Sequence, residues 1–331
     1  MQSPYGVHRV IGEDGLLPQP AQRLDAGPPC GSLEMQIAVE RLHVDASSLR
    51  QLRLACGGDL AAVRAELLSL VQRRGKLHNP VTNSGGMLIG SVSAVGPDYP
   101  DPPPRGTRVA TLASLTLTPL RLEDLGAVDA HSNAIAARGV AYLFARSPWV
   151  ALPSDIPESV LLAALDVAGA PARVRLRCRP GMRVLIVGAG NSGALSALAA
   201  LEAGVDEVLV TDISQSRLER IGALGLAGLQ VRQADASNAL EFAALAGAPA
   251  DLTVSCVDRA GVEMACILAT RSEGHVLFFS MTTDFARAAL GAEGVGSGAA
   301  LEIGNGYLPG HATMTIDLLR RHPDAWDLLV R

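Results

Sequence analysis

The chain has 331 residues, of which 48% are hydrophobic and 18% are charged, and its formal net charge is −5. This length and composition allow two globular domains with large cores and argue against an intrinsically disordered chain. The acidic balance, without a basic tract or interleaved basic and aromatic residues, argues against a nucleic-acid partner.

The sequence shows no sign of a secreted or membrane protein. The first ten residues lack the apolar stretch of a signal peptide, and the most apolar segment, 159–170, is too short to span a bilayer and contains Asp166. No two cysteines form a C-x-x-C pair among Cys30, Cys56, Cys178, Cys256 and Cys266. We therefore expect a cytoplasmic protein without a membrane span, a disulfide framework or a structural zinc cluster.

Residues 1–152 predict a mostly-β domain built from short elements and turns. The predicted order is an irregular arm (1–30), a strand (33–42), a polar patch (43–48), a helix (60–74) ended by Gly75, a polar loop (76–86), a strand (87–95), a proline-rich turn (97–106) and two short strands (108–118 and 141–150). We expect this domain to bind the substrate.

Residues 153–306 predict an α/β domain. A helix over 153–170 precedes six apolar runs that alternate with helical segments, at 183–187, 208–211, 229–232, 252–256, 275–280 and 301–303. This alternation is typical of a six-stranded, doubly wound parallel sheet, the Rossmann fold. Residues 307–331 contain a last helix, 311–321, which we expect to return to the N-terminal domain.

A glycine motif at the end of the first of these strands predicts a dinucleotide site. Gly188 allows a tight turn, Gly190 a close approach of a pyrophosphate, and Gly193 close packing of the helix over 194–203. Asn191 and Ser192 lie at the helix N-terminus, whose free N–H groups favour phosphate. The alternative is a glycine-rich turn that binds nothing.

The cofactor is expected to be NAD, because Asp212 ends the second strand, where a carboxylate binds the ribose hydroxyls and repels a 2′-phosphate. Arg217 is the feature that would instead favour NADP. Ligands of such sheets bind at the carboxyl ends of the strands. The further cofactor-binding candidates at those ends are Cys256, Val257, Ser280, Met281 and Thr282.

Lys76 is the only lysine among the 28 Lys and Arg residues. Lysine differs from arginine because it is a compact point charge and can lose its proton when it is buried. These properties favour a functional role at position 76. A lysine that remains by chance at an exposed site is the alternative.

The order of the two domains resembles the medium-chain dehydrogenase/reductase superfamily, which includes the zinc alcohol dehydrogenases. Their catalytic zinc is held in part by a Gly-His-Glu-x-x-Gly stretch, and the matching stretch here is Gly85-Gly86-Met87-Leu88-Ile89-Gly90. Gly86 and Met87 replace the histidine and the glutamate, and neither suits zinc. Cys56 has no partner cysteines, so we predict no metal site.

Five stretches resemble the family of L-erythro-3,5-diaminohexanoate dehydrogenases more narrowly: 74–90, 165–171, 278–283, 289–296 and 303–307. The resemblance implies NAD-dependent oxidative deamination of a diamino acid to 5-amino-3-oxohexanoate and ammonia, in lysine fermentation and without zinc. The superfamily also suggests a homodimer by analogy.

The implied reaction requires a cation for the substrate carboxylate, oxygen ligands for its ammonium groups, and a base. Each candidate has a structural alternative. Lys76 is the candidate for carboxylate anchor or base, Asp166 and Glu293 for ammonium ligands, and Asp45, Ser48 and His78 for the lining of the site. The alternatives are a surface lysine, a helix carboxylate paired with an arginine, an exposed loop acid and an ordinary polar turn.

Two other functions remain open at this point. A zinc-free quinone or enone reductase of the same superfamily has the same layout, although Asp212 and the polar loop 76–84 argue against it. A non-catalytic dinucleotide-binding protein is the second, because a fold does not guarantee an activity.

Overall fold

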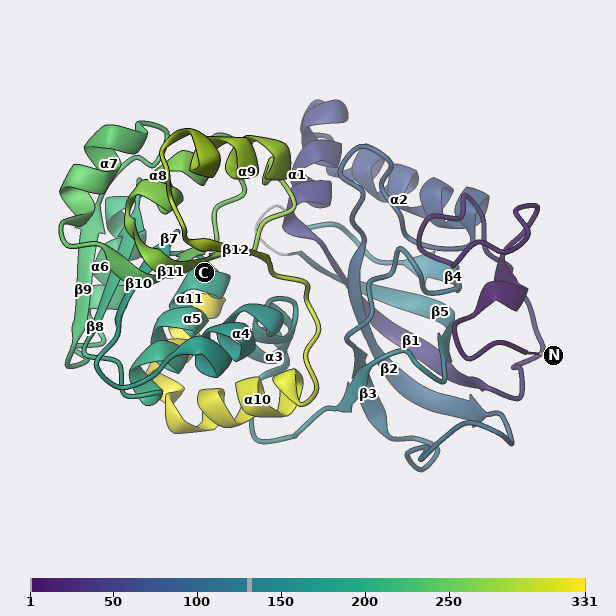
Figure 1. Cartoon of the computed structure of the whole chain (residues 1–331). Helices are drawn as coiled ribbons and strands as arrows, with labels where there is room; N and C mark the ends of the chain where they lie inside the picture. The colour runs from purple at the N-terminus through teal and green to yellow at the C-terminus, as the bar shows by residue number, and fades with distance from the viewer. Residues whose placement is uncertain (1, 130–132, 331) are drawn as a thin grey trace. The chain divides into compact units, whose positions relative to one another are not determined.

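The computed structural model describes residues 2–129 and 133–330, and the chain divides into two compact units, Met1–Asp155 and Ile156–Arg331. Unit 1 is the mostly-β half and unit 2 the α/β half (Figure 1). The two-domain α/β architecture expected from the sequence is confirmed.

Unit 1 contains a six-stranded sheet in the order β4-β5-β1-β2-β3-β6, with antiparallel neighbours throughout. Its strands are β1 (Glu34–Val44), β2 (Gly86–Val95), β3 (Arg108–Thr111), β4 (Leu120–Leu125), β5 (Ala134–Phe144) and β6 (Trp149–Ala151). Alternate apolar residues of β1, such as Met35 and Ile37, are fully buried in the core of this unit.

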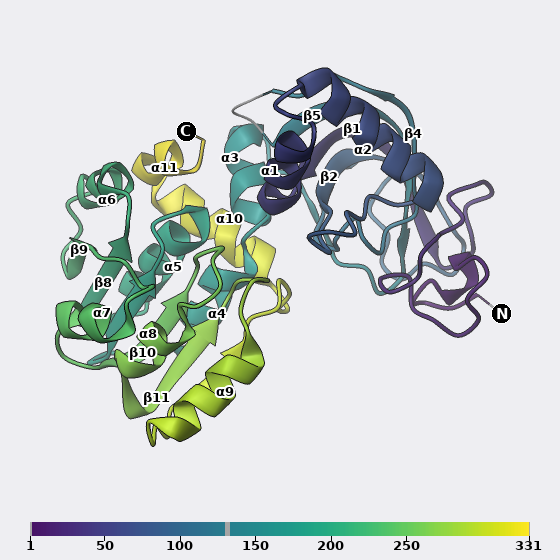
Figure 2. The ribbon, with the colours of Figure 1, turned by 90° about the horizontal axis from the view of Figure 1, so that it is seen from above.

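Two helices, α1 (Ala46–Ala55) and α2 (Leu60–Arg74), cover one face of this sheet (Figures 1 and 2). Leu49 of α1 and Leu67 of α2 are buried in the core of unit 1. The sequence analysis missed α1, because its first turn is rich in serine and was interpreted as a polar patch. The helix forms because Asp45 caps it, accepting hydrogen bonds from the amides of Ser47 and Ser48.

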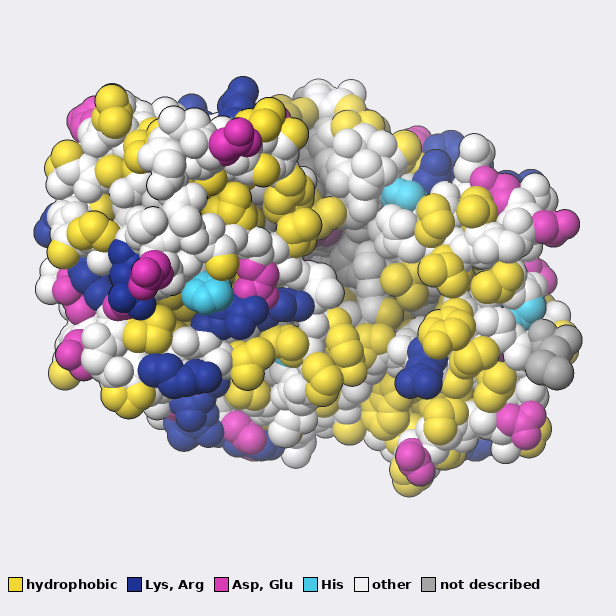
Figure 3. Space-filling model, viewed as in Figure 1, with side chains coloured by type: hydrophobic (Ala, Val, Ile, Leu, Met, Phe, Trp, Pro, Cys, Tyr) yellow, Lys and Arg dark blue, Asp and Glu magenta, His cyan; other side chains and the backbone are white. Residues whose placement is uncertain are grey.

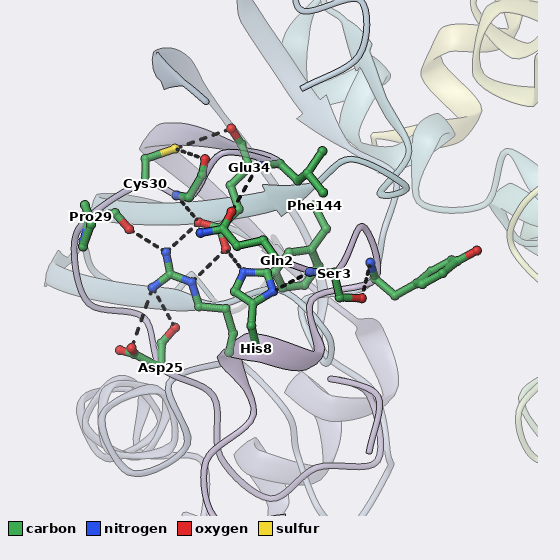
Figure 4. A network of polar contacts seen from close by, with 12 residues as sticks. Gln2, Ser3, His8, Asp25, Pro29, Cys30, Glu34 and Phe144 are labelled. Atoms are coloured by element: carbon green, nitrogen blue, oxygen red, sulfur yellow. Dashed lines mark hydrogen bonds and ion pairs between the residues drawn. The ribbon is translucent and has the colours of Figure 1, made fainter. Parts of the chain in front are cut away.

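The described part of the N-terminal arm, residues 2–30, is folded onto unit 1, although the short 3-10 helix η1 (Val7–Arg9) is its only helix or strand. The guanidinium of Arg9 donates to both carboxylate oxygens of the fully buried Glu34, at 2.8 and 2.6 Å, and lies 4.3 Å from the Tyr142 ring centroid. His8 reaches the same carboxylate at 2.8 Å (Figure 4). Burial raises and Arg9 lowers the pKa of Glu34, with a net lowering. The arm is thus anchored by a buried ion pair.

Two strand predictions in unit 1 were wrong in extent. The strand expected over 108–118 ends at Thr111, and a separate strand, β4, begins at Leu120. The strand expected over 141–150 is two strands, since β5 ends at Phe144 and β6 begins at Trp149, with a turn between them. The sequence does not reveal these turns, because the apolar residues of 108–118 and 141–150 show no alternation that would mark the end of each strand.

Unit 2 contains the predicted six-stranded parallel sheet, in the order β12-β11-β10-β7-β8-β9. This is the strand order of a doubly wound dinucleotide-binding fold. The strands are β7 (Arg183–Val187), β8 (Glu207–Asp212), β9 (Leu229–Gln233), β10 (Ala250–Ser255), β11 (Thr270–Phe278) and β12 (Ala300–Ile303).

Helices cover both faces of this sheet because successive residues of its central strands point to opposite sides. Val184 and Ile186 of β7 belong to one apolar cluster, and Leu185 and Val187 to the other. The first face is covered by α4 (Gly169–Arg177), α5 (Asn191–Glu202) and α6 (Gln215–Gly222), and the second by α7 (Ala239–Ala246), α8 (Glu263–Leu268) and α9 (Phe285–Gly294) (Figure 1).

The helix predicted over 153–170 is interrupted. Helix α3 (Glu158–Leu165) ends before Asp166, and α4 begins at Gly169. Between them the amides of Val167 and Ala168 bond to carbonyls three residues back, which is a tighter turn than an α-helix. A Cβ on Gly169 would lie 2.7 Å from the backbone of Gly306, so glycine allows this close contact.

The C-terminal segment differs from the expectation that it returns to the N-terminal domain. Helix α10 (His311–Arg321) packs on α3, α4 and α5 of unit 2, and the 3-10 helix η2 (Pro323–Ala325) and α11 (Trp326–Leu329) follow within the same unit. The buried side chains of Ile316 and Leu319 explain why this helix stays there. None of the helices in 2–129 and 133–330 is long and apolar enough to cross a membrane.

Candidate active site

The glycine loop after β7 has the geometry that the sequence motif predicts. Gly188 has a φ of +109°, and a Cβ on Gly193 would lie 1.8 Å from the carbonyl oxygen of Gly188. A Cβ on Gly190 would meet nothing within 4 Å. Two of the glycines are therefore required by the loop itself, whereas Gly190 leaves open space in front of the loop. That space suits the approach of a pyrophosphate.

Helix α5 offers free amides at this loop. Its N-cap is Gly190, which has no side chain to bond the N–H groups of the first turn, where Asn191 and Ser192 lie. The Ser192 hydroxyl donates instead to the Cys256 thiol at 3.4 Å. The uncapped helix N-terminus is a site for a phosphate group.

Asp212 ends β8 with its carboxylate held toward the glycine loop. One oxygen accepts from the amide of Ala189 at 2.7 Å and the other from the amide of Ser214 at 2.8 Å. Arg217 lies 4.0 Å from the first oxygen, and its side chain is 59% exposed. The structure therefore fixes a carboxylate beside the loop, and an arginine near it.

The other cofactor candidates follow β10 and β11. Cys256 and Val257 are half-buried beside Gly188, and burial raises the pKa of Cys256 to about 11. After β11, the hydroxyls of Ser280 and Thr282 bond each other at 2.8 Å, and Met281 is 83% exposed. These residues lie at the carboxyl edge of the sheet, as expected from the sequence.

Glu263 is a residue that the sequence analysis missed. It is fully buried at the start of α8, and its Oε1 accepts from the amide of Asp284 at 2.9 Å. It thereby joins the segment after β10 to the segment after β11. Oε2 has no hydrogen-bond partner in the described part of the chain. A single glutamate in an apolar run carries no motif that would have identified it.

In unit 1, a cluster of hydroxyl groups gathers on Asp45. Ser84 donates to Asp45 Oδ1 at 3.1 Å, and the amide of Ser47 donates to the same oxygen at 2.9 Å. The buried Ser48 hydroxyl lies 2.6 Å from both Ser84 Oγ and Thr82 Oγ1. Asp45 and Ser48 therefore do not form the solvated turn that was the alternative. We call Asp45, Ser47, Ser48, Thr82 and Ser84 the hydroxyl cluster.

The direction of the hydrogen bonds in this cluster follows from its acidic end. An ionised carboxylate only accepts, so Ser84 gives its proton to Asp45 and its oxygen accepts from Ser48. Thr82 Oγ1 lies 2.6 Å from Ser48 Oγ and 3.0 Å from Ser84 Oγ, so Thr82 can donate to either hydroxyl. All the hydroxyl protons point toward Asp45, and Thr82 Oγ1, on a half-buried side chain, keeps an acceptor lone pair at the outer end.

The loop that carries Thr82 and Ser84, residues 77–85, is held by its own polar groups. Asn79 is buried, donates to Gln51 of α1 at 2.8 Å and accepts from the amide of Val81 at 2.9 Å. His78 is buried too, and its Nε2 lies 3.4 Å from Asn83 Oδ1. Burial, with a smaller effect of Lys76, lowers the pKa of His78. His78 thus supports the loop from inside.

His43, at the end of β1, is a second buried imidazole near the hydroxyl cluster. Burial lowers its pKa to about 4, and Asp45 opposes this only in part. The ring is therefore neutral at physiological pH. A Cβ on Gly86 would lie 2.0 Å from the His43 carbonyl oxygen, which explains the glycine at that position.

Lys76 is not the surface lysine that was its alternative, because it is 0% exposed. Its Nζ donates to the carbonyl oxygens of Pro18 and Gln19 at 2.7 and 2.8 Å. The ammonium is thus used inside unit 1. This corrects the assignment of Lys76 as a substrate anchor or base, since a fully buried group bonded to carbonyls does not present its charge to a ligand.

Two carboxylates lie elsewhere than the sequence suggested. Asp166 is exposed in the turn after α3 rather than within a helix. Glu293 is exposed in the last turn of α9 rather than in a loop after β11. A helix that begins after β11 carries its last turn away from the carboxyl edge of the sheet, at about 1.5 Å per residue. Glu293 therefore lies away from the carboxyl edge of the sheet, where its expected role as an ammonium ligand would place it.

The residues present do not fit the catalytic zinc of the alcohol dehydrogenases. Gly86 and Met87 occupy the positions of the histidine and glutamate, and within 2–129 and 133–330 no three His, Cys, Asp or Glu side chains are grouped as metal ligands. All five cysteines are unbridged. Acidic and basic side chains are interspersed on the face shown in Figure 3.

Comparison with known proteins shows to which family this chain belongs. The family model for the N-terminal domain of L-erythro-3,5-diaminohexanoate dehydrogenase matches residues 8–153. Enzymes of that name from Acetoanaerobium sticklandii and Fusobacterium nucleatum are each 39% identical to this chain over 329 residues, covering 96% of this chain and 94% of theirs. The chain belongs to the L-erythro-3,5-diaminohexanoate dehydrogenase family. The resemblance seen in its loops is thereby confirmed, and the protein is an oxidoreductase of the dehydrogenase type.

Solved structures place this family in a wider fold group. The CurK enoyl reductase has a TM-score of 0.58 and 18% identity, and the match covers 93% of this chain and 85% of that chain. At this identity the likeness shows the fold alone, which is that of the medium-chain dehydrogenase/reductases. The fold and the dehydrogenase relatives together indicate a nicotinamide dinucleotide cofactor.

Proposed function

We propose that this protein catalyses the NAD-dependent oxidative deamination of L-erythro-3,5-diaminohexanoate to 5-amino-3-oxohexanoate and ammonia, without a metal ion. The proposal rests on the name of its 39% identical relatives and on one observation, the chain of hydroxyls that ends on Asp45. A diamino acid is the small-molecule partner that such a cluster suits, because its two amines are cationic.

The hydroxyl cluster is assigned two tasks, to bind the reacting amine and to accept its proton. Thr82 Oγ1 presents an acceptor lone pair, which an ammonium N–H can use. A protonated amine cannot release hydride, so one proton must first leave it. We assign that proton transfer to Thr82, which passes the proton to Ser84 directly or through Ser48, and to Ser84, which passes it to Asp45 as the acceptor at the inner end. Each hydroxyl passes on one proton and receives another.

The cofactor side is assigned to the glycine loop. The space in front of Gly190 and the free amides of α5 would hold the pyrophosphate, and Asp212 the adenosine ribose. A dinucleotide held there would supply the acceptor for the hydride that leaves C3 of the substrate. NAD is favoured over NADP because Asp212 is buried and repels a 2′-phosphate, whereas Arg217 is exposed.

After hydride loss the substrate is an imine, which water hydrolyses to the ketone and ammonia. No step of this reaction uses zinc, because Gly86 and Met87 offer no suitable ligand. An amine also depends less on a Lewis acid than an alcohol does, since its own lone pair must remain free to expel hydride.

The test is direct. Purified protein is mixed with NAD and L-erythro-3,5-diaminohexanoate, and NADH absorbance and released ammonia are measured with and without a chelator. Equal amounts of NADH and ammonia, undiminished by the chelator, support the proposal. Reduction of a quinone or enone by NADPH instead would favour the reductase alternative. Dinucleotide binding without turnover of any amine would favour a non-catalytic protein.

Two further assignments are proposals of the same kind. A cytoplasmic location is supported by the five unbridged cysteines. A homodimer is suggested by analogy with the superfamily, and size-exclusion chromatography with light scattering would test it.

A further inference from the structure

The single lysine of the chain forms an internal tie in unit 1. Lys76 is 0% exposed, and its Nζ donates to two consecutive carbonyls of the N-terminal arm, those of Pro18 and Gln19. Arginine is the basic residue nearly everywhere else in the sequence. A guanidinium is planar and larger, whereas the compact ammonium can converge on two adjacent carbonyl oxygens. The position therefore uses a property that arginine lacks.

The N-terminal arm also contacts the two residues that precede Lys76. The amide of Leu24 donates to the Arg74 carbonyl at 2.8 Å, and a Cβ on Gly75 would lie 1.9 Å from the Leu24 carbonyl oxygen. Gly75 has a φ of +63°, so glycine is required there on both grounds. Residues 74–76, at the end of α2, are thus held in place by the N-terminal arm, and we call these three residues the clamp.

Loop 77–85 starts immediately after this clamp. Its two ends touch, because a Cβ on Gly85 would lie 2.3 Å from the Leu77 carbonyl oxygen. A shift at Lys76 is therefore passed to both ends of the loop. The same loop carries Thr82 and Ser84, whose hydroxyls reach Ser48 at 2.6 Å. Such distances leave little room for displacement of the loop.

We propose that Lys76 is a positioning residue, which ties the N-terminal arm to loop 77–85 and so holds Thr82 and Ser84 on Ser48. The proposal deepens the proposed function and rests on it for its effect on catalysis. The tie itself does not depend on that function, so the two can fail separately.

Hydrogen exchange measured by mass spectrometry tests the tie without reference to activity. In Lys76→Met, which keeps the length and burial of the side chain but removes its donors, we expect amide exchange in residues 16–24 and 77–85 to accelerate by about 10- to 100-fold. The control is Arg73→Met, which removes an exposed cation that pairs with Glu66 one residue before the clamp. It should exchange like the native protein. Unchanged exchange in Lys76→Met would overturn the proposal.

Kinetics then test the consequence. We expect Lys76→Met to lower kcat for the diamine by about 10- to 100-fold while the Kd for NAD stays native, because the glycine loop belongs to unit 2. Lys76→Arg should recover part of kcat, since it restores donors. If Lys76→Met does not fold, as its circular dichroism spectrum and melting temperature would reveal, Lys76→Gln, which keeps one donor group, takes its place in both measurements.

The outcomes separate the two proposals. Faster loop exchange without any turnover by the native protein would leave the tie intact and refute the proposed function. Native turnover that Lys76→Met or its substitute retains in full would refute the positioning role, whatever the exchange data show.

Discussion

Gly193 faces the carbonyl oxygen of Gly188 so closely that a Cβ on Gly193 would lie 1.8 Å from it, whereas nothing lies within 4 Å of a Cβ on Gly190. The first contact is internal to the protein, and the second position is open to a ligand. The three glycines of the motif therefore differ in what their replacement should do.

Gly190→Val should fold normally and lose cofactor affinity. Gly190 has extended backbone angles that any residue adopts, and the new side chain would fill the space proposed for the pyrophosphate. We expect its Kd for NAD to rise by at least about 100-fold, measured by calorimetry. Gly193→Val is the matched comparison, and we expect its melting temperature to fall because the clash is with backbone. Native NAD affinity in Gly190→Val would contradict the cofactor assignment.

Asp212→Asn should weaken the preference of the protein for NAD over NADP. The amide oxygen can still accept a hydrogen bond from Ala189, but the charge that repels a 2′-phosphate is gone. We expect the Kd for NAD to rise by about tenfold and the ratio of the NADP to the NAD constants to fall. Arg217→Met serves as the control, since removal of the exposed arginine should not strengthen NADP binding. A native ratio in Asp212→Asn would show that Asp212 does not select the cofactor.

Ser84→Ala should interrupt proton transfer to Asp45. It removes the hydroxyl through which both Thr82 and Ser48 reach the carboxylate, whereas Asp45 still caps α1. We expect kcat for the diamine to fall by about 10²- to 10⁴-fold with a nearly native Kd for NAD. Ser93→Ala, at an exposed hydroxyl of β2, is the control. A steady-state assay that finds native kcat for Ser84→Ala would remove the cluster from the mechanism.

Lys76 should make the free energy of unfolding increase with pH in the alkaline range. Burial, and to a smaller extent Arg74, lowers its pKa from 10.5 to about 8, against an opposing effect of Glu13. Between these values the unfolded chain binds a proton that the folded one has lost, so the free energy of unfolding rises with pH. We expect the native protein to gain up to about 1.4 kcal/mol per pH unit relative to Lys76→Met in this window.

Urea denaturation of both proteins between pH 7 and pH 10.5 checks this prediction. Below pH 8 the lysine is protonated in both states, so the difference between the two proteins should be constant there. Parallel curves over the whole range would mean that Lys76 titrates as it does in an unfolded chain. Cysteine and tyrosine titrations occur in both proteins and cancel in the comparison.

The sequence by itself determined the architecture of unit 2 and its ligand loop. Apolar runs of three to six residues, regular spacing and the order Gly188, Gly190, Gly193 and Asp212 are local signals, because each reports the backbone conformation or the burial of its own segment. The same is true of α2, which has helical spacing and ends at Gly75. The family resemblance of loop 77–85 was also visible in the order of its residues.

The tertiary structure decided how the residues of unit 1 are used. Asp45, Ser48, Thr82 and Ser84 are separated by up to 39 positions, and only the packing of α1 against the loop brings them together. Lys76 bonds to carbonyls 58 and 57 positions earlier, a partnership that leaves no periodic trace in the sequence. Backbone carbonyls have no identity in a sequence, so a side chain that binds them cannot be distinguished, before folding, from one that binds a substrate.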